Sequence, residues 1–415
     1  MTRQRLFNKN FVLLALGQVS SLMGNYSLKF ALSMYVLEIT GSAAIFSGIL
    51  AVSMVPVILL SPFGGILADR VNRRNIMVTL DALSGMTVLA AAGFWNQGSE
   101  LLVIGALLVI LSVLGAFESP AVQACVPQML SGELILKGNA VVGQIQAATS
   151  LTAPFLGSVL YTAWGIRPVL GAAAVCFFIT AFMECFISAG SEPEYGNKTK
   201  KQKIGTAVRE DFAVSVRFLG KERTEVLKLL LLAAAVSLFA AGTVVVGFPY
   251  LVRTTLGLSA WHYGIAESVM GAAAVLGGAV AGILGERLRI RRMHRLIGAV
   301  GICLMLGGAV FCLPAGISGK YLILLAMFGG CQMACSIFSI YALSVIQQKT
   351  PRRLTGKVMA CVFTLSMCAQ PVGQILYGAL FDIFADSVYW VLIPSGGMVW
   401  ALGMAAARFF GKLEA

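Results

Sequence analysis

Hydrophobic residues fall in long continuous runs along this chain, without the alternation of polar and apolar positions that marks the strands of a membrane barrel. Each run approaches or exceeds the length of about 20 residues that a helix needs to cross a bilayer. Six runs precede a polar stretch and six follow it, so the pattern predicts twelve membrane-spanning helices in two groups. The runs lie near 11–37, 43–67, 76–95, 101–122, 139–163, 166–189, 226–252, 261–284, 296–314, 320–346, 358–381 and 387–408.

The composition excludes the common classes of soluble protein. Of the 415 residues, 58% are hydrophobic and 12% are charged, whereas soluble domains carry about 25% charged residues. So much apolar sequence would leave large exposed patches on a soluble core. The nine cysteines sit mostly within the apolar runs and form no CxxC pair, and only two histidines are present. We therefore expect reduced cysteines that pack as small hydrophobic residues, and neither a metal site nor a cofactor.

The net charge of +13 comes from 31 Lys and Arg residues against 18 acidic ones. If the N-terminus lies inside the cell, all but four of these basic residues fall in cytoplasmic segments. This asymmetry is the positive-inside pattern of membrane proteins. It predicts a multi-pass protein of the inner or plasma membrane with both termini in the cytoplasm. Contact with anionic lipids then explains the charge, and binding of nucleic acid is not needed. The four exceptions are Lys29, Arg167, Arg253 and Lys320.

The polar stretch divides the chain into three parts: a six-helix bundle in residues 1–189, a linker in 190–225, and a second six-helix bundle in 226–415. The linker contains the basic segment KTKKQK and then an amphipathic pattern. Such a pattern is typical of a helix that lies on the membrane surface. A simple linker between two halves, or a regulatory binding segment, would also fit.

Several landmarks recur at one common offset between the two halves, which indicates an internal duplication. Four of them follow the second helix of each half, and the fifth is a proline in each fifth helix. Such a loop could act as a charged latch, because Asp69 could bind a helix N-terminus or a nearby arginine. The matched pairs are Gly65 with Gly282, Asp69 with Glu286, Arg70 with Arg287, Arg74 with Arg291, and Pro154 with Pro371.

The segment GGILADRVNRR, residues 64–74, resembles the loop signature Gly-x-x-x-Asp-Arg-x-Gly-Arg-Arg of the major facilitator superfamily. The resemblance rests on Gly65, Asp69, Arg70, Arg73 and Arg74. Asn72 stands in place of the usual glycine, and asparagine tolerates a left-handed turn better than most residues. The copy from Gly282 to Arg291 is degenerate.

Two further segments are similar to the branch of that superfamily that contains macrolide-efflux and enterobactin-exporter proteins. They are AFESPAVQACVPQMLSGELILKGNA, followed by Pro154 and Gly157, and RFLGKERTEVLKLLLL at the start of the second half. The resemblance implies a transporter that works by alternating access and exports an amphipathic organic compound in exchange for protons.

Polar residues inside spanning helices are candidate functional residues, because they are costly in lipid. Gln18, Ser21, Asn25 and Lys29 follow one another at helical spacing on the first helix, so they share one face. That face lines a cavity or bonds to a neighbouring helix. Later helices carry similar residues, which suggests a mildly polar cavity suited to an amphipathic ligand. These later candidates are Gln146, Gln332, Ser336, Gln370 and Gln374.

Five charged residues fall inside the predicted spans. Lys29 and Glu267 are at similar depth toward the outside, which suggests an ion pair that gates the outer side or is linked to protons. Asp81 is expected to join the inner latch with the arginines. Glu118 could join that latch or carry a proton, and Glu184 is expected to reach toward the membrane interface.

Other functional classes have little support in the sequence. An HExxH motif and a GxxxxGK[ST] loop are both missing, which argues against a metalloenzyme and against direct use of ATP. We do not expect an enzyme. The alternatives are an exporter of siderophores or lipids, or a membrane sensor that has this fold but does not transport. Nothing in the sequence requires more than a monomer.

Overall fold

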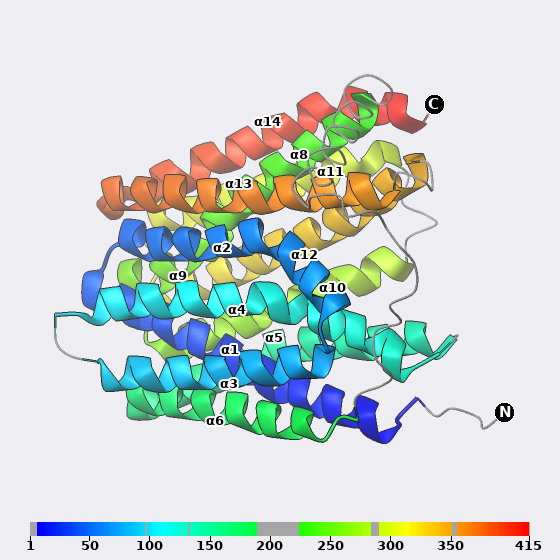
Figure 1. Ribbon diagram of the computed structural model, residues 1–415. Coiled ribbons are helices and arrows are strands. Elements are labelled where there is room, and N and C mark those ends of the chain that lie inside the picture. Colours follow the sequence, from blue (N-terminus) through cyan, green and yellow to red (C-terminus); the bar gives the residue numbers. More distant parts are fainter. Residues whose placement is uncertain are drawn as a thin grey trace. The chain divides into compact units, whose positions relative to one another are not determined.

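The computed structural model describes residues 6–95, 98–131, 133–188, 224–283, 290–350 and 355–414. Within these residues the secondary structure is helical, with twelve long helical segments (Figure 1). This confirms the predicted all-helical membrane architecture. The segments of the first half are α1 (Lys9–Thr40), α2 (Ala43–Arg70), α3 (Arg73–Gly93), α4 (Glu100–Met129), α5 (Glu133–Trp164) and α6 (Ile166–Cys185).

The second half begins with one continuous helical segment, Thr224–Thr255, which contains α8 (Thr224–Ala240), α9 (Phe248–Tyr250) and two π-helical stretches. The π-helical stretches are Ala241–Gly247 and Leu251–Thr255. Such stretches are rare and often occur at functional sites. The remaining long helices are α10 (Ala260–Ile283), α11 (Met293–Ala309), α12 (Ile317–Lys349), α13 (Thr355–Ile383) and α14 (Tyr389–Glu414).

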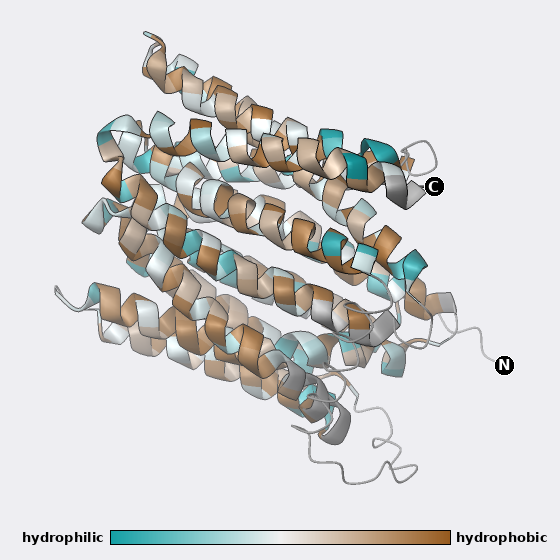
Figure 2. Ribbon diagram, turned by 90° about the horizontal axis from the view of Figure 1, so that it is seen from above, coloured by the Kyte–Doolittle hydropathy of each residue, from teal (hydrophilic) through white to brown (hydrophobic). Residues whose placement is uncertain are grey.

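Ten helical segments in the described part of the chain are long and apolar enough to cross a membrane. The other two long helices, α5 and α13, contain 32 and 29 residues. Figure 2 shows hydrophobic residues along the lengths of the helices. Many large apolar side chains face outward, including Leu102 at 78% exposure and Leu136 at 77%. Exposed apolar surface of this extent fits contact with lipid.

The chain groups into two compact units. The first contains Met1–Gly41, Ile49–Gly196 and Leu258–Gly271, and the second contains Ser42–Gly48, Asn197–Gly257 and Ala272–Ala415. A split at the linker alone would have placed the first turns of α2 in the first unit and all of α10 in the second. The predicted surface helix in 190–225 lies almost entirely outside the described residues.

In the first unit, α1 packs against α5 and α6, and α3 packs against α4 and α6 (Figure 1). Small residues allow the close approach of α1 and α5. A methyl group on Gly157 would lie 3.0 Å from the carbonyl oxygen of Ser27, and the Ser27 hydroxyl donates a hydrogen bond of 2.9 Å to the Ala153 carbonyl. Contacts of this kind drive helix association in lipid, where apolar burial adds little.

In the second unit, α11 packs against α14 through glycines. A methyl group on Gly396 would lie 2.5 Å from the Gly301 carbonyl oxygen, whereas one on the adjacent Gly397 would meet no atom within 4 Å. We expect Gly396→Ala to destabilise the protein by about 1–3 kcal/mol, because backbone atoms cannot yield to the methyl group. Gly397→Ala is the matched control and should be neutral or slightly stabilising. Thermal unfolding in detergent would compare the two, and equal midpoints would contradict this account of the packing.

Candidate functional site

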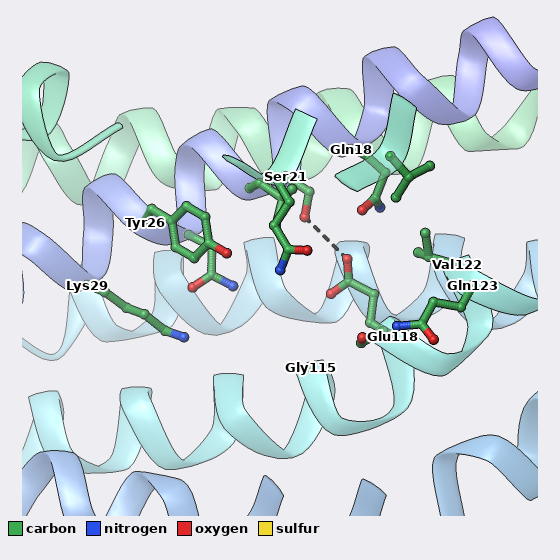
Figure 3. Close-up of a pocket in the computed structure, with 13 residues that line it drawn as sticks. Gln18, Ser21, Tyr26, Lys29, Gly115, Glu118, Val122 and Gln123 are labelled. Carbon is green, nitrogen blue, oxygen red and sulfur yellow. Dashed lines mark hydrogen bonds between the residues drawn. The ribbon is translucent and has the colours of Figure 1, made fainter. Parts of the chain in front are cut away.

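A cavity of about 200 Å³ lies in the first unit, along the polar face of α1 (Figure 3). The face predicted from helical spacing lines this cavity, because Gln18, Ser21, Asn25 and Lys29 are all in its wall. Facing them are residues of α4 and α5. The other lining residues are Leu22, Tyr26, Gly115, Glu118, Ser119, Val122, Gln123, Val142 and Gln146.

The cavity contains one cationic and one anionic side chain. Lys29 is exposed, and Figure 3 shows its amine reaching into the cavity from α1 while Glu118 enters from α4. The two charges interact. The Ser21 hydroxyl lies 3.4 Å from Glu118 Oε1, the contact drawn as a dashed line in Figure 3. Opposite charges, amides and an aromatic ring therefore share one small cavity.

The proposed pairing of Lys29 with Glu267 is not what the structure shows. The carboxylate that faces Lys29 is Glu118. Glu267 instead hydrogen-bonds Tyr263, one turn away on α10. The prediction compared depths along single helices, and such depths do not reveal which helices are neighbours.

Asp81 also lies elsewhere than expected. It is fully buried on α3 and accepts a 2.9 Å hydrogen bond from the Ser21 hydroxyl. Of the arginines with which it was expected to form a latch, Arg73 donates to the Ala124 carbonyl at 2.7 Å, and Arg74 donates to the Cys185 carbonyl. Asp81 thus bonds to Ser21 of the polar α1 face.

A second cavity, of about 300 Å³, lies in the second unit beside the π-helical stretch Ala241–Gly247. Three of the predicted residues, Gln332, Ser336 and Gln370, line it. Gln374 does not line it, and its side chain is only 4% exposed. The remaining lining residues are Ser237, Ala240, Ala241, Val244, Val245, Cys335 and Ser339. None of these side chains is charged, in contrast to the α1 cavity.

Comparison with known families identifies the chain. Residues 14–374 match the family model described as Major Facilitator Superfamily. The chain belongs to the major facilitator superfamily. Members of this superfamily are membrane transporters, so the protein is a multi-pass membrane transporter.

The chain is also similar to individual proteins of the superfamily. The chain is 24% identical to "Macrolide efflux protein A" of Streptococcus pyogenes, over 92% of this chain and 91% of that protein. It is also 24% identical to "Enterobactin exporter EntS" of Citrobacter koseri, over 76% and 72% of the two chains. Among solved structures, the chain is similar to a mutant of the nucleoside transporter NupG, with a TM-score of 0.76 and 11% identity. The alignment covers 98% of this chain and 100% of that chain. These matches confirm the family and the branch that the sequence resembles, and the structural match confirms the fold.

The superfamily loop signature is described only in part. Asn72 has φ of −60° and caps the N-terminus of α3 by accepting from the Arg74 amide at 3.1 Å. The suggested left-handed turn is therefore wrong, and the asparagine serves as a helix cap. Gly65, Asp69 and Arg70 lie in the last two turns of α2, and the structure describes only their backbone. In the second copy, Gly282 lies at the end of α10, and Glu286 and Arg287 fall outside the described residues.

Sequence reasoning missed several residues of the α1 site. Ser119 and Gln123 line the cavity from α4, one turn apart beside Glu118. That spacing inside an apolar run was a usable signal. Glu184 was expected to reach the membrane interface, yet it is fully buried. Its burial follows from the approach of α6 to Gly17, since a methyl group there would lie 3.8 Å from Glu184 Cγ.

The described residues contain no group of three or more His, Cys, Asp or Glu side chains arranged to hold a metal ion. The eight cysteines that the structure describes are free thiols. The linings of the two cavities offer amides, hydroxyls, an aromatic ring and the Lys29 and Glu118 charges.

Proposed function

We propose that the protein exports amphipathic organic compounds of the macrolide or drug type across the cell membrane by alternating access, in exchange for protons. The observation that carries this proposal is the α1 cavity, where Glu118 and Lys29 stand among amides on otherwise apolar helices. A charged side chain in a spanning helix marks a substrate or ion pathway. The relative named for macrolide efflux supports the substrate class.

The chemistry of the cavity fits a ligand with an apolar body and one basic amine. Glu118 can pair with the amine, and the Tyr26 ring offers an apolar surface beside it. Gln18, Asn25 and Gln146 can donate or accept hydrogen bonds and so tolerate different substrates. The protein would act as a monomer, without a cofactor and without enzymatic activity. Both termini would lie in the cytoplasm, as the distribution of Lys and Arg indicates.

A second candidate is export of an anionic compound such as a siderophore. The exposed amine of Lys29 favours it, since that amine could pair with a catecholate or carboxylate. The relative named as an enterobactin exporter points the same way. A lipid exporter, or a sensor that binds without transport, would use the same cavity.

The test is an efflux assay in bacteria that lack their own drug exporters. We expect expression of the protein to lower the retention of erythromycin or ethidium, both of which are amphipathic cations, and a protonophore to abolish that effect. Retention that is unchanged by expression would contradict drug export. Binding without any change in retention would favour the sensor, and export of a catecholate alone would favour the second candidate.

A further inference from the structure

Two carboxyl groups lie behind the α1 cavity, out of contact with solvent. Asp81 on α3 and Glu184 on α6 both have zero exposure. They lie close enough for a hydrogen bond between their carboxyl groups, if one of them carries a proton. An apolar pair would pack in a spanning region at least as well as two acidic side chains that face each other. The two acids therefore point to a function.

These carboxyl groups are almost without hydrogen-bond donors. Asp81 Oδ2 and both oxygens of Glu184 have no partner, and Ser21 is the donor to Asp81 Oδ1. A buried carboxylate oxygen without a donor is strongly unfavourable. A proton on one of the two carboxyl groups would supply the missing donor and bond them together.

The charged and titratable groups that the structure describes around the pair do not neutralise it. From α4, Glu118 faces both acids, and the Cys125 thiol is near Glu184. From α6, Cys185 is next to Glu184. At the start of α3, Arg73 and Arg74 donate to the carbonyls of Ala124 and Cys185. On α1, Lys29 faces Glu118. The described charged residues that act on Asp81 are Glu118 and Glu184, and both are acidic. The pair therefore needs a proton and not a counter-ion.

We propose that the Asp81–Glu184 pair holds the proton that is exchanged for substrate, and that Ser21 connects it to the α1 cavity. This inference rests on the proposed export function and assigns the proton to a place within it. The Ser21 hydroxyl lies 2.9 Å from Asp81 and 3.4 Å from Glu118. It can accept a proton from the pair and donate its own toward Glu118 or cavity water, so the proton passes from one carboxyl group to the cavity.

The arrangement also couples the proton to the substrate by charge. An ionised Glu118 favours a proton on the pair, because like charges repel. A cationic substrate that pairs with Glu118 removes that repulsion and adds a positive charge, so it favours release of the proton. Proton and substrate therefore oppose each other without sharing a binding site, which is what exchange transport requires.

The experiment compares the purified wild type with Asp81→Asn and Glu184→Gln in proteoliposomes. We expect both variants to lose erythromycin accumulation driven by a pH gradient by about tenfold or more, the size of a typical coupling between two sites. They should retain exchange of labelled for unlabelled erythromycin in the absence of a gradient, because that process needs no net proton movement. Glu100→Gln, at the start of α4 and bonded to Gly98, is the control and should behave as wild type.

The outcomes separate this inference from the export function. A wild type that accumulates neither erythromycin nor ethidium would remove the export function. Wild-type accumulation that persists in both variants would overturn the proton site, and so would loss of exchange together with accumulation in folded variants. The wild type provides a test that does not depend on folding of a variant. A hydrophobic carbodiimide should modify Asp81 or Glu184, since this reagent reacts with protonated carboxyl groups, and mass spectrometry that finds both residues unmodified would also overturn the site.

Discussion

Glu118→Gln is expected to weaken the binding and export of erythromycin and ethidium by about tenfold or more, because a charge-assisted bond contributes about 1.5–3 kcal/mol. Glu118 lies in the cavity wall, and its carboxylate is the anionic group of that cavity. The glutamine keeps the shape of the side chain and removes only the charge. Dissociation constants from ethidium fluorescence, together with cellular retention, would measure the loss.

The conservative variant Glu118→Asp serves as the control, because it retains the charge and should restore part of the binding. The binding constant also distinguishes this residue from the buried pair: Asp81→Asn leaves the Glu118 carboxylate in the cavity, so it should change ethidium affinity less than Glu118→Gln does. If Glu118→Gln bound ethidium as tightly as the wild type, the carboxylate would have no role in recognising cations. Loss of catecholate export in Lys29→Gln would then support the siderophore candidate.

The spans and the face of α1 could be predicted from the sequence because both depend on local regularity. Apolar runs of sufficient length specify spanning helices whatever lies beside them. Likewise, residues three or four apart share a helical face, so Gln18, Ser21, Asn25 and Lys29 had to point the same way. A stripe of polar side chains on an apolar helix avoids lipid, and the structure gives it a cavity.

The partners of these residues could not be predicted, because they depend on which helices pack together. Residue counting placed Lys29 and Glu267 at similar depth but could not show that Lys29 faces Glu118 of α4. Glu184 was misjudged for a related reason. Its position near the end of a run suggested the membrane interface, whereas the absence of a side chain at Gly17 and Gly24 of α1 lets α6 approach and bury it.

The N-terminus of α2 depends on another contact that the sequence did not reveal. Asp382, near the end of α13, accepts from the Ser42 hydroxyl at 2.5 Å, the Ala43 amide at 2.7 Å and the Ala44 amide at 3.1 Å. The first amides of a helix have no partner within the helix, and their partial positive charge favours an anion. These residues lie more than 330 positions apart in the chain, so local capping patterns could not identify the carboxylate.

Asp382→Ala should therefore free the first turn of α2. Loss of charge-assisted bonds contributing about 2 kcal/mol in total would speed amide hydrogen exchange in residues 43–48 by about thirtyfold. Asp382→Asn keeps an acceptor and should have an intermediate effect. Asp386→Ala is the matched control, because Asp386 is exposed in the short 3-10 turn that follows and should leave the exchange rates unchanged. Unaltered exchange in Asp382→Ala would mean that Ser42, which also accepts from the Ile45 amide, is a sufficient cap without the carboxylate.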